Sequence, residues 1–171
     1  MGQAQVSTAM RLRPATAEDG FMIRRWLKDP ALQACWGNRA SAEAEITLAR
    51  ISQTALCRIV ICEGTPIGYA QAIETGLGAG ARAPEILPGT WDTQFWIAPA
   101  RQRGRAVLAA VPALLAQEVF ATTLAVACSG LVLIKQEMLV RAYEAAGFRW
   151  RRICHDPVFG PAWLLLKERP H

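Results

Sequence analysis

The sequence predicts an α+β domain in which helices flank a central mixed, mostly antiparallel sheet. Strand-like and helix-like segments follow one another in mixed order, and a tight turn joins two consecutive strand-like segments. Apolar residues make up 52% of the 171 residues, which is enough to bury a substantial core. The length suits one domain, which we place at residues 10–171, after a tail over 1–9 that we expect to be mobile.

The first half of the chain is expected to form a strand, two helices and a hairpin. A strand over 10–13 is followed by a helix that Thr16 and Asp19 cap and that ends near Asp29. Ser41 is expected to cap a second helix. A tight turn joins the next two strands, so they should form an antiparallel hairpin; they span 57–62 and 67–74.

The second half alternates strands and helices after a Gly-, Ala- and Pro-rich stretch, 76–90, that we expect to be a long surface loop. Pro99 ends the first of these strands, Pro112 should kink the long helix, and Gly147 ends the short one. In chain order, the expected elements span 91–98 (strand), 104–121 (helix), 124–128 (strand), 136–146 (helix), 148–154 (strand) and 162–167 (strand).

Charge and cysteine content limit the classes of partner. The 19 basic and 14 acidic side chains give a net charge of +5, which favours anionic ligands such as phosphates but is too small to indicate nucleic acid. The five cysteines are scattered, so we interpret them as reduced thiols of a cytoplasmic protein. With two histidines, one of them the last residue, we expect no metal site.

An apolar stretch runs from Ala106 to Ile134, with Glu118 as its only charged residue. Pro112 and several polar residues interrupt it, whereas a membrane helix needs about 20 consecutive, predominantly apolar residues. We therefore expect a buried helix followed by a buried strand, and no membrane partner. The N-terminus also lacks the basic and apolar regions of a secretory signal.

The segment most informative about function is a basic turn between a strand and a helix, QFWIAPARQRGRA at 94–106. Amides at a helix N-terminus are unpaired, and the helix dipole adds partial positive charge there. Gly104 would let a phosphate approach the backbone, and the turn adds the charges of Arg101, Arg103 and Arg105. These features predict a pyrophosphate cradle; the alternative is a solvated basic turn.

Two motifs resemble the signatures of the GNAT superfamily of N-acetyltransferases. Arg101, Gly104 and Ala106 occupy the defining positions of the acyl-CoA signature Q/R-x-x-G-x-G/A. The segment YEAAGF at 143–148 resembles the second signature, Y-E-x-x-G-F, and the two occur in the family's order with a strand between them. The resemblance implies the GNAT-type acyl-CoA N-acyltransferase fold over nearly the whole chain, with acetyl-CoA as the donor.

A narrower resemblance is to the aminoglycoside 6'-N-acetyltransferase branch. The segments RLRPAT at 11–16 and PIGYAQ at 66–71 carry it, together with WDTQF at 91–95, which resembles the branch's D-Q-F segment with Thr93 interposed. The hydroxamate-siderophore acyltransferases share a similar Trp-Leu-x-x-Pro opening, which is WLKDP at 26–30 in this sequence. The chain departs from the family at Gln136, where Asn is usual.

The resemblance implies roles for particular residues. Tyr143 would protonate the departing CoA thiolate as a general acid, the alternative being a core tyrosine. Asp92 would hold or remove the proton of the attacking amine, the alternative being a solvated aspartate at a strand end. The residues expected to bind the cofactor are Phe95, Trp96, Ile97, Ala98, Arg101, Gln102, Arg103, Gly104, Arg105, Ala106 and Gln136.

Candidate substrate-binding residues are Trp36, beside a glycine, Trp91, at a strand entry, and Glu74. Trp26 is expected in the core. Glu74 and Glu85 are weaker candidates for the task of Asp92. An aminoglycoside site should be acidic, and the few clustered acidic residues of this sequence argue against an efficient drug-modifying enzyme.

We therefore expect a monomeric or homodimeric N-acetyltransferase that moves the acetyl group directly from acetyl-CoA to a small-molecule amine. None of the cysteines is needed, which argues against an acyl-cysteine intermediate. Two alternatives stay open: an acyltransferase for a protein N-terminus or a siderophore precursor, and a CoA-binding module without catalysis. No nucleic-acid partner is expected.

Overall fold

The computed structural model describes residues 9–75, 86–156 and 159–171, so Glu85, most of the predicted loop and all but the last residue of the predicted tail lie outside it. The strands span Met10–Pro14 (β1), Ala55–Cys62 (β2), Thr65–Glu74 (β3), Thr90–Ile97 (β4), Ala127–Leu133 (β5), Arg149–Asp156 (β6) and Gly160–Glu168 (β7). The helices span Ala17–Asp19 (η1), Gly20–Trp26 (α1), Pro30–Trp36 (α2), Arg39–Ile51 (α3), Ala100–Gln102 (η2), Arg105–Thr122 (α4) and Glu137–Ala145 (α5).

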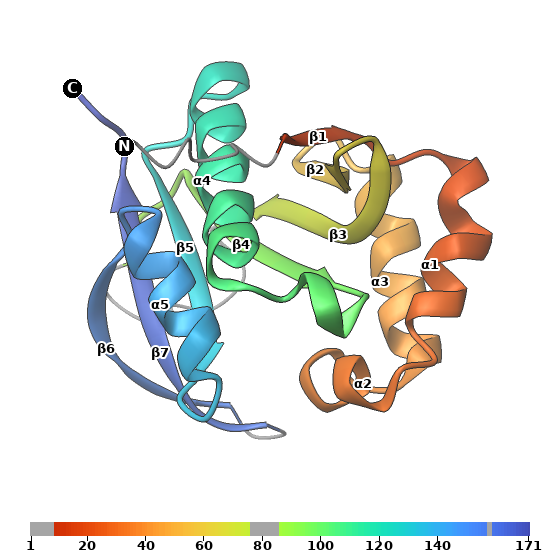
Figure 1. Ribbon diagram of the computed structural model, residues 1–171. Coiled ribbons are helices and arrows are strands. Elements are labelled where there is room, and N and C mark those ends of the chain that lie inside the picture. Colours follow the sequence, from red (N-terminus) through yellow and green to blue (C-terminus); the bar gives the residue numbers. More distant parts are fainter. Residues whose placement is uncertain (1–8, 76–85, 157–158) are drawn as a thin grey trace, which may run out of the picture.

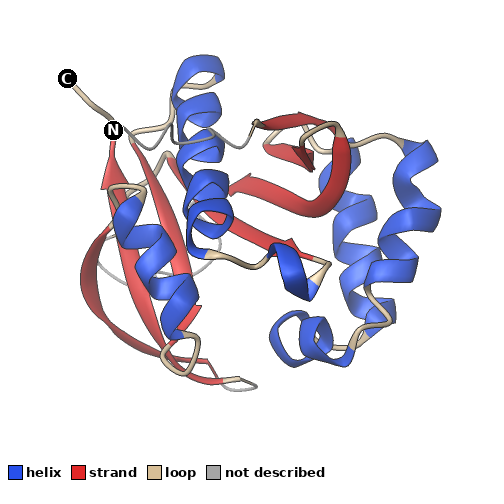
Figure 2. Cartoon of the chain, in the orientation of Figure 1, coloured by secondary structure: helices blue, strands red, loops and turns tan. Residues whose placement is uncertain are grey.

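The strands form one sheet in the order β1-β2-β3-β4-β5-β7-β6. Every neighbouring pair is antiparallel except β4 and β5, which run parallel. Figure 2 shows the helices packed against this sheet. The predicted fold class and the predicted β2–β3 hairpin are confirmed.

Helices α1, α2 and α3 cover β2, β3 and β4 on one face of the sheet, where Ile23, Leu27 and Ile46 pack with Ile59 and Tyr69. The predicted capping pair begins this region. The Asp19 carboxylate accepts the Thr16 backbone N–H at 2.8 Å, and it also accepts two N–H groups of Arg13 at 2.8 and 2.7 Å.

Two expectations in this region were wrong. Asn38 caps α3, and its side-chain oxygen accepts the N–H of Ser41 at 2.9 Å, so Ser41 lies inside the helix. Helix α2, which the sequence pattern did not indicate, follows α1. Pro30 occupies its first turn, where a missing N–H costs nothing, and the Asp29 side chain accepts the N–H of Ala31 at 2.9 Å.

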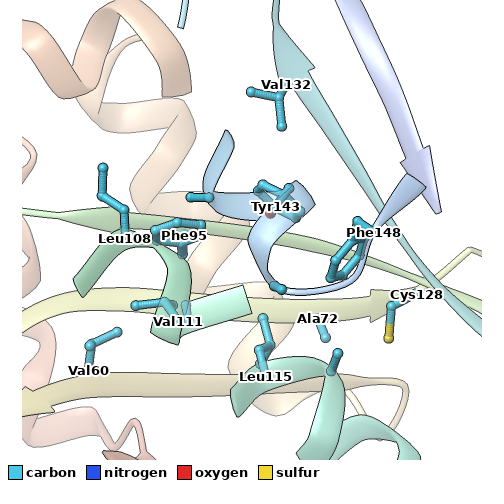
Figure 3. Close-up of a cluster of buried hydrophobic side chains, with 14 of the residues drawn as sticks. Val60, Ala72, Phe95, Leu108, Val111, Leu115, Cys128, Val132, Tyr143 and Phe148 are labelled. Atoms are coloured by element: carbon cyan, nitrogen blue, oxygen red, sulfur yellow. The ribbon is translucent and has the colours of Figure 1, made fainter. Parts of the chain in front are cut away.

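Helices α4 and α5 pack on the opposite face. Val111, Leu115 and Val119 of α4 are fully buried in the cluster that Figure 3 shows, which also holds Phe95 of β4 and Phe148. The helix is long and apolar enough to cross a membrane by length and composition. In this fold its apolar face is core, as the sequence predicted; the predicted kink within it stays a prediction.

The predicted strand at 124–128 was misplaced, because β5 begins at Ala127 and continues to Leu133. The residues before it form the loop after α4, and Leu124 is 96% exposed. The guanidinium of Arg169 stabilises this loop by donating to the backbone carbonyls of Phe120, Thr123 and Ala125, at 2.8, 2.7 and 2.6 Å.

The short parallel pairing of β4 and β5 determines where a site can form. Only 90–93 of β4 pair with 127–130 of β5. Beyond this point β4 continues against β3, and β5 continues against β7. The two strands therefore separate, as Figure 1 shows, and leave a gap within the sheet.

Candidate active site

A cavity of about 1630 Å³ lies where β4 and β5 separate. Residues 94–97 line it from β4 and 131–133 line it from β5, and α2, the start of α5 and the β6–β7 hairpin contribute further walls. The predicted site residues that line this cavity are Trp36, Glu74, Asp92, Phe95, Trp96, Ile97, Arg103, Gln136 and Tyr143. The fold thus brings both predicted catalytic residues into one space.

The other predicted residues lie elsewhere. Trp91 is 6% exposed and belongs to the core cluster on the α4 side. Trp91 faces the side of β4 opposite to Asp92, and it does not line the cavity. The residues near η2 and the start of α4 that lie outside the cavity lining are Ala98, Arg101, Gln102, Gly104, Arg105 and Ala106.

The separated edge of β4 presents backbone polar groups to the gap. The N–H of Ala98 donates to the Ile67 carbonyl on β3 at 2.7 Å, so the polar groups of Ile97 point the other way. The carbonyl of Thr93 also faces the gap side, because the Tyr143 hydroxyl donates to it at 3.1 Å. By the same alternation, the N–H and carbonyl of Phe95 face the gap, where they can pair with an extended ligand.

Arg103, which was expected to bind phosphate, also hydrogen-bonds to the protein itself. Its Nε donates to the Ile97 carbonyl at 2.7 Å, and its Nη2 donates to the Ala98 carbonyl at 2.8 Å. Nη2 also contacts the Asp29 carboxylate at 3.2 Å. Arg103 therefore ties the end of β4 to the start of α2, whereas Arg101 and Arg105 are both exposed.

The start of α4 is open to an anion. Gly104 is its N-cap, with φ −76° and ψ 163°, and none of the described side chains hydrogen-bonds to the cap. A Cβ built at Gly104 would meet nothing within 4 Å. The amides of the first turn thus lie at the surface of an 18-residue helix, with its positive dipole end behind them.

Tyr143 of α5 lies at the point where β4 and β5 separate. It is 2% exposed, and its ring packs edge-on against Phe148 at 4.9 Å between centroids (Figure 3). Burial raises the pKa of Tyr143 above its usual value, while the hydrogen bond with Thr93 lowers it. The hydroxyl is therefore protonated at neutral pH and has a proton to give.

Asp92 reaches the cavity from the other face of β4. Its Oδ1 accepts the hydroxyl of Ser129 on β5 at 2.9 Å. By strand alternation it shares its face with Gln94 and Trp96. A carboxylate here can accept a proton from an amine or hold a cationic one.

A polar network that the sequence did not indicate lies beside Asp92. The hydroxyl of Tyr69 donates to Gln71 Oε1 at 2.9 Å. Gln71 Nε2 then donates to Glu45 Oε1 on α3 and to Gln94 Oε1, both at 3.2 Å. Glu45, Glu74 and Asp92 are distant in sequence, so only the fold shows that their side chains line the same cavity.

Trp36 and Trp96 form the aromatic wall of this side. Their ring centroids are 4.7 Å apart and the rings are nearly perpendicular, at 85°. Trp96 is 4% exposed, and among the described residues its Nε1 is the only buried side-chain nitrogen or oxygen without a hydrogen bond. An unpaired buried donor costs free energy, which an acceptor atom on a ligand would recover.

Gln136, at the start of α5, meets Cys35 of α2 at the cavity. Its Nε2 contacts the Cys35 sulfur at 2.7 Å. Burial raises the pKa of the Cys35 thiol, which makes it a weak nucleophile at neutral pH. Within the described residues, no group of three or more His, Cys, Asp or Glu side chains is placed to hold a metal ion.

Comparisons with known proteins agree with this geometry. A family model described as an acetyltransferase (GNAT) domain matches residues 15–155. No curated protein sequence matches the chain significantly.

Solved structures share the fold. A crystal structure of the aminoglycoside acetyltransferase AAC(6')-Ib in complex with coenzyme A superposes with a TM-score of 0.80 at 26% identity, covering 94% of this chain and 95% of that one. A second AAC(6')-Ib structure, with paromomycin and acetyl-CoA, gives 0.80 at 26% identity, covering 94% of each chain. RimJ of Mycobacterium smegmatis, in complex with CoA-disulfide, has the same fold, with a TM-score of 0.73 at 14% identity, covering 94% of this chain and 82% of that one. With the family model spanning most of its length, the chain belongs to the GNAT family of acetyltransferases.

Proposed function

We propose that the protein transfers the acetyl group of acetyl-CoA directly to a primary amine. The observation that carries this proposal is the gap between β4 and β5. There the free backbone edge of Phe95, the Tyr143 hydroxyl and the Asp92 carboxylate border one cavity. An extended thioester on one side and an amine on the other would meet at this point.

The cofactor would lie along the separated edge of β4. Its pantetheine amides would pair with the backbone groups of Phe95, as an added strand pairs with a sheet edge. Its pyrophosphate would bind the first-turn amides of α4 beside Gly104, with Arg101 and Arg105 neutralising its charge. The AAC(6')-Ib structures with coenzyme A and acetyl-CoA support this choice of donor.

Acetyl transfer needs two proton movements, and the two proposed catalytic residues suit one each. The neutral amine attacks the thioester carbonyl, a C–N bond forms, and the excess proton of the amine passes to Asp92 or to water. The C–S bond then breaks, and Tyr143 protonates the leaving thiolate. The two groups approach from opposite faces of β4, so neither blocks the other.

The acceptor would be a cationic amine. Acidic side chains outnumber basic ones in the cavity lining, five (Glu45, Glu74, Asp92, Glu137 and Asp156) to three (Arg103, Lys135 and Arg152), and an excess of negative charge favours a cationic ligand. Trp36 and Trp96 add aromatic surface against which a cation or a sugar ring can pack. Aminoglycosides, which AAC(6')-Ib structures hold, are one such class.

A panel of amines tests the proposal. Purified protein and acetyl-CoA are mixed with aminoglycosides, polyamines, peptides with free N-termini and hydroxylamine siderophore precursors. Products are detected by mass spectrometry, because the five thiols would disturb a thiol-reagent assay. We expect amine-dependent acetylation among the cationic members. Tight acetyl-CoA binding without any acetylated product would instead indicate a non-catalytic CoA-binding module.

A further inference from the structure

We propose that Thr93 is a positioning residue for Tyr143. The Thr93 hydroxyl, together with Gly130 on the neighbouring strand, holds the Tyr143 hydroxyl beside the last residue pair that β4 and β5 form. The inference rests on the proposed function, in which Tyr143 protonates the thiolate. Neither Thr93 nor Gly130 belongs to the two signature motifs read from the sequence.

Thr93 connects three elements of the fold. It is 1% exposed on β4, and its Oγ1 donates to the carbonyl of Ser129 on β5 at 2.8 Å. The same oxygen lies 3.2 Å from the hydroxyl of Tyr143 on α5. Because the Thr93 hydrogen is directed to Ser129, its lone pairs are free to accept from Tyr143.

A single residue therefore offers the Tyr143 hydroxyl two acceptors, the Thr93 carbonyl at 3.1 Å and Thr93 Oγ1 at 3.2 Å. A threonine hydroxyl can also rotate and donate. When Tyr143 gives its proton to the thiolate, the Thr93 hydroxyl can turn from Ser129 and donate to the phenolate. Burial raises the pKa of Tyr143, and its hydrogen bond with Thr93 opposes that rise.

Gly130 lies directly opposite Thr93 in the β4–β5 pairing. A Cβ at this position would come within 2.5 Å of Tyr143 Cε1, 2.9 Å of Cδ1 and 3.0 Å of Cζ. The ring thus lies directly on the backbone of Gly130, and a larger residue would push it away. Phe95 and Phe148 contact the same ring, with centroids 5.9 and 4.9 Å from it.

Position along the strands gives this contact its functional meaning. Thr93 and Gly130 are the last paired residues before β4 and β5 separate. A hydroxyl held here stands at the start of the gap, where the thioester would lie. Displacing it by the width of a methyl group would remove it from reach of the sulfur, since proton transfer needs about 2.6–3.2 Å between heavy atoms.

Two substitutions separate the hydroxyl of Thr93 from its shape. Thr93→Val keeps the branched side chain and removes the hydroxyl, whereas Thr93→Ser keeps the hydroxyl. With acetyl-CoA and the amine acetylated fastest in the panel, we expect Thr93→Val to lower kcat about tenfold or more with the KM for acetyl-CoA unchanged, and Thr93→Ser to restore most of it. In a Tyr143→Phe background, Thr93→Val should cause no further loss.

A spectroscopic measurement tests the same contact without any amine substrate. The chain has two tyrosines, Tyr69 and Tyr143, so ¹³Cζ labelling gives two resonances that Tyr143→Phe assigns. Thr93→Val should shift the Tyr143 resonance and leave that of Tyr69 in place. Gly130→Ala keeps every hydrogen-bonding group and displaces the ring, so it should shift the same resonance and lower kcat.

The outcomes distinguish the two claims. Wild-type kcat in folded Thr93→Val, or additive losses with Tyr143→Phe, would overturn the inference and leave the role of Tyr143 intact. Full kcat in Tyr143→Phe, or no acetylated amine at all, would overturn the proposed function and the inference with it. If Thr93→Val fails to fold by circular dichroism, Gly130→Ala decides: an unmoved Tyr143 resonance with unchanged kcat refutes the inference.

Discussion

Replacing Gly104 with aspartate places a carboxylate at the N-cap of α4, and the protein itself should tolerate it. The backbone there is extended, at φ −76° and ψ 163°, and a Cβ would meet no atom within 4 Å. Aspartate is among the best N-cap residues and exceeds glycine by a few tenths of a kcal/mol. Gly104→Asp should therefore unfold at the same urea concentration as the wild type or slightly above it.

The substitution should weaken the binding of acetyl-CoA. A carboxylate about 4 Å from one phosphate charge costs about 1 kcal/mol in a water-like dielectric and about 4 kcal/mol at an effective dielectric of about 20. The turn is exposed, so the repulsion energy for each of the two pyrophosphate charges should be near the lower of these values. A total of about 2–4 kcal/mol weakens the affinity for acetyl-CoA by about 30-fold to 700-fold.

Calorimetric titration with acetyl-CoA measures the loss of affinity, and two matched variants separate the effect of charge from the effect of side-chain size. Gly104→Asn has the shape and capping ability of aspartate without its charge, and Gly104→Ala adds only a methyl group. The Asp–Asn difference isolates charge and should shrink at high salt, because ions screen an exposed site. Near-unchanged affinity in folded Gly104→Asp would refute the phosphate site at α4.

Four further outcomes are expected. Tyr143→Phe should lower kcat roughly a hundredfold and leave acetyl-CoA affinity in calorimetry nearly intact, because only a transition-state proton is lost. Asp92→Asn should raise the KM for a cationic amine more than it changes acetyl-CoA affinity; equal KM values would place the amine elsewhere. Alkylation after denaturation without reduction should label all five cysteines, since none of them is in a disulfide, and a mass deficit would reveal a bridge. Burial raises the pKa of Cys128 from 9.0 to about 12. The folded state therefore holds this proton longer than the unfolded state, and the free energy of unfolding in urea should fall as pH rises above 9.0.

Much of the fold was predictable because its signals are local. The Thr16–Asp19 capping pair and the tight turn between β2 and β3 each act within a few residues. So does Gly147, whose φ of +94° ends α5 where the sequence predicted. Helix α2 was not predicted, because its seven residues are too few to show a helical period. Its Pro30 was interpreted as the end of the preceding helix.

The site was less predictable because its contacts join distant segments. The sequence shows three arginines in the turn, but not that the guanidinium of Arg103 satisfies carbonyls at the separated end of β4. It shows scattered acidic residues, but not that Gln71 joins Glu45 to Gln94. Such pairings depend on which strands become neighbours and where they part.

The threonine interposed in the segment WDTQF has a structural consequence that follows from strand geometry alone. In the D-Q-F segment that it resembles, the aspartate directly precedes the glutamine, so the two side chains face opposite sides of the strand. Here Thr93 separates them, so Asp92 shares the face of Gln94 and lies on the side of Glu45. The side chain that Thr93 places beside Tyr143 carries a hydroxyl, 3.2 Å from the tyrosine oxygen. A neutral partner suits a buried tyrosine that must give up a proton, because a carboxylate in the same place would oppose formation of the phenolate.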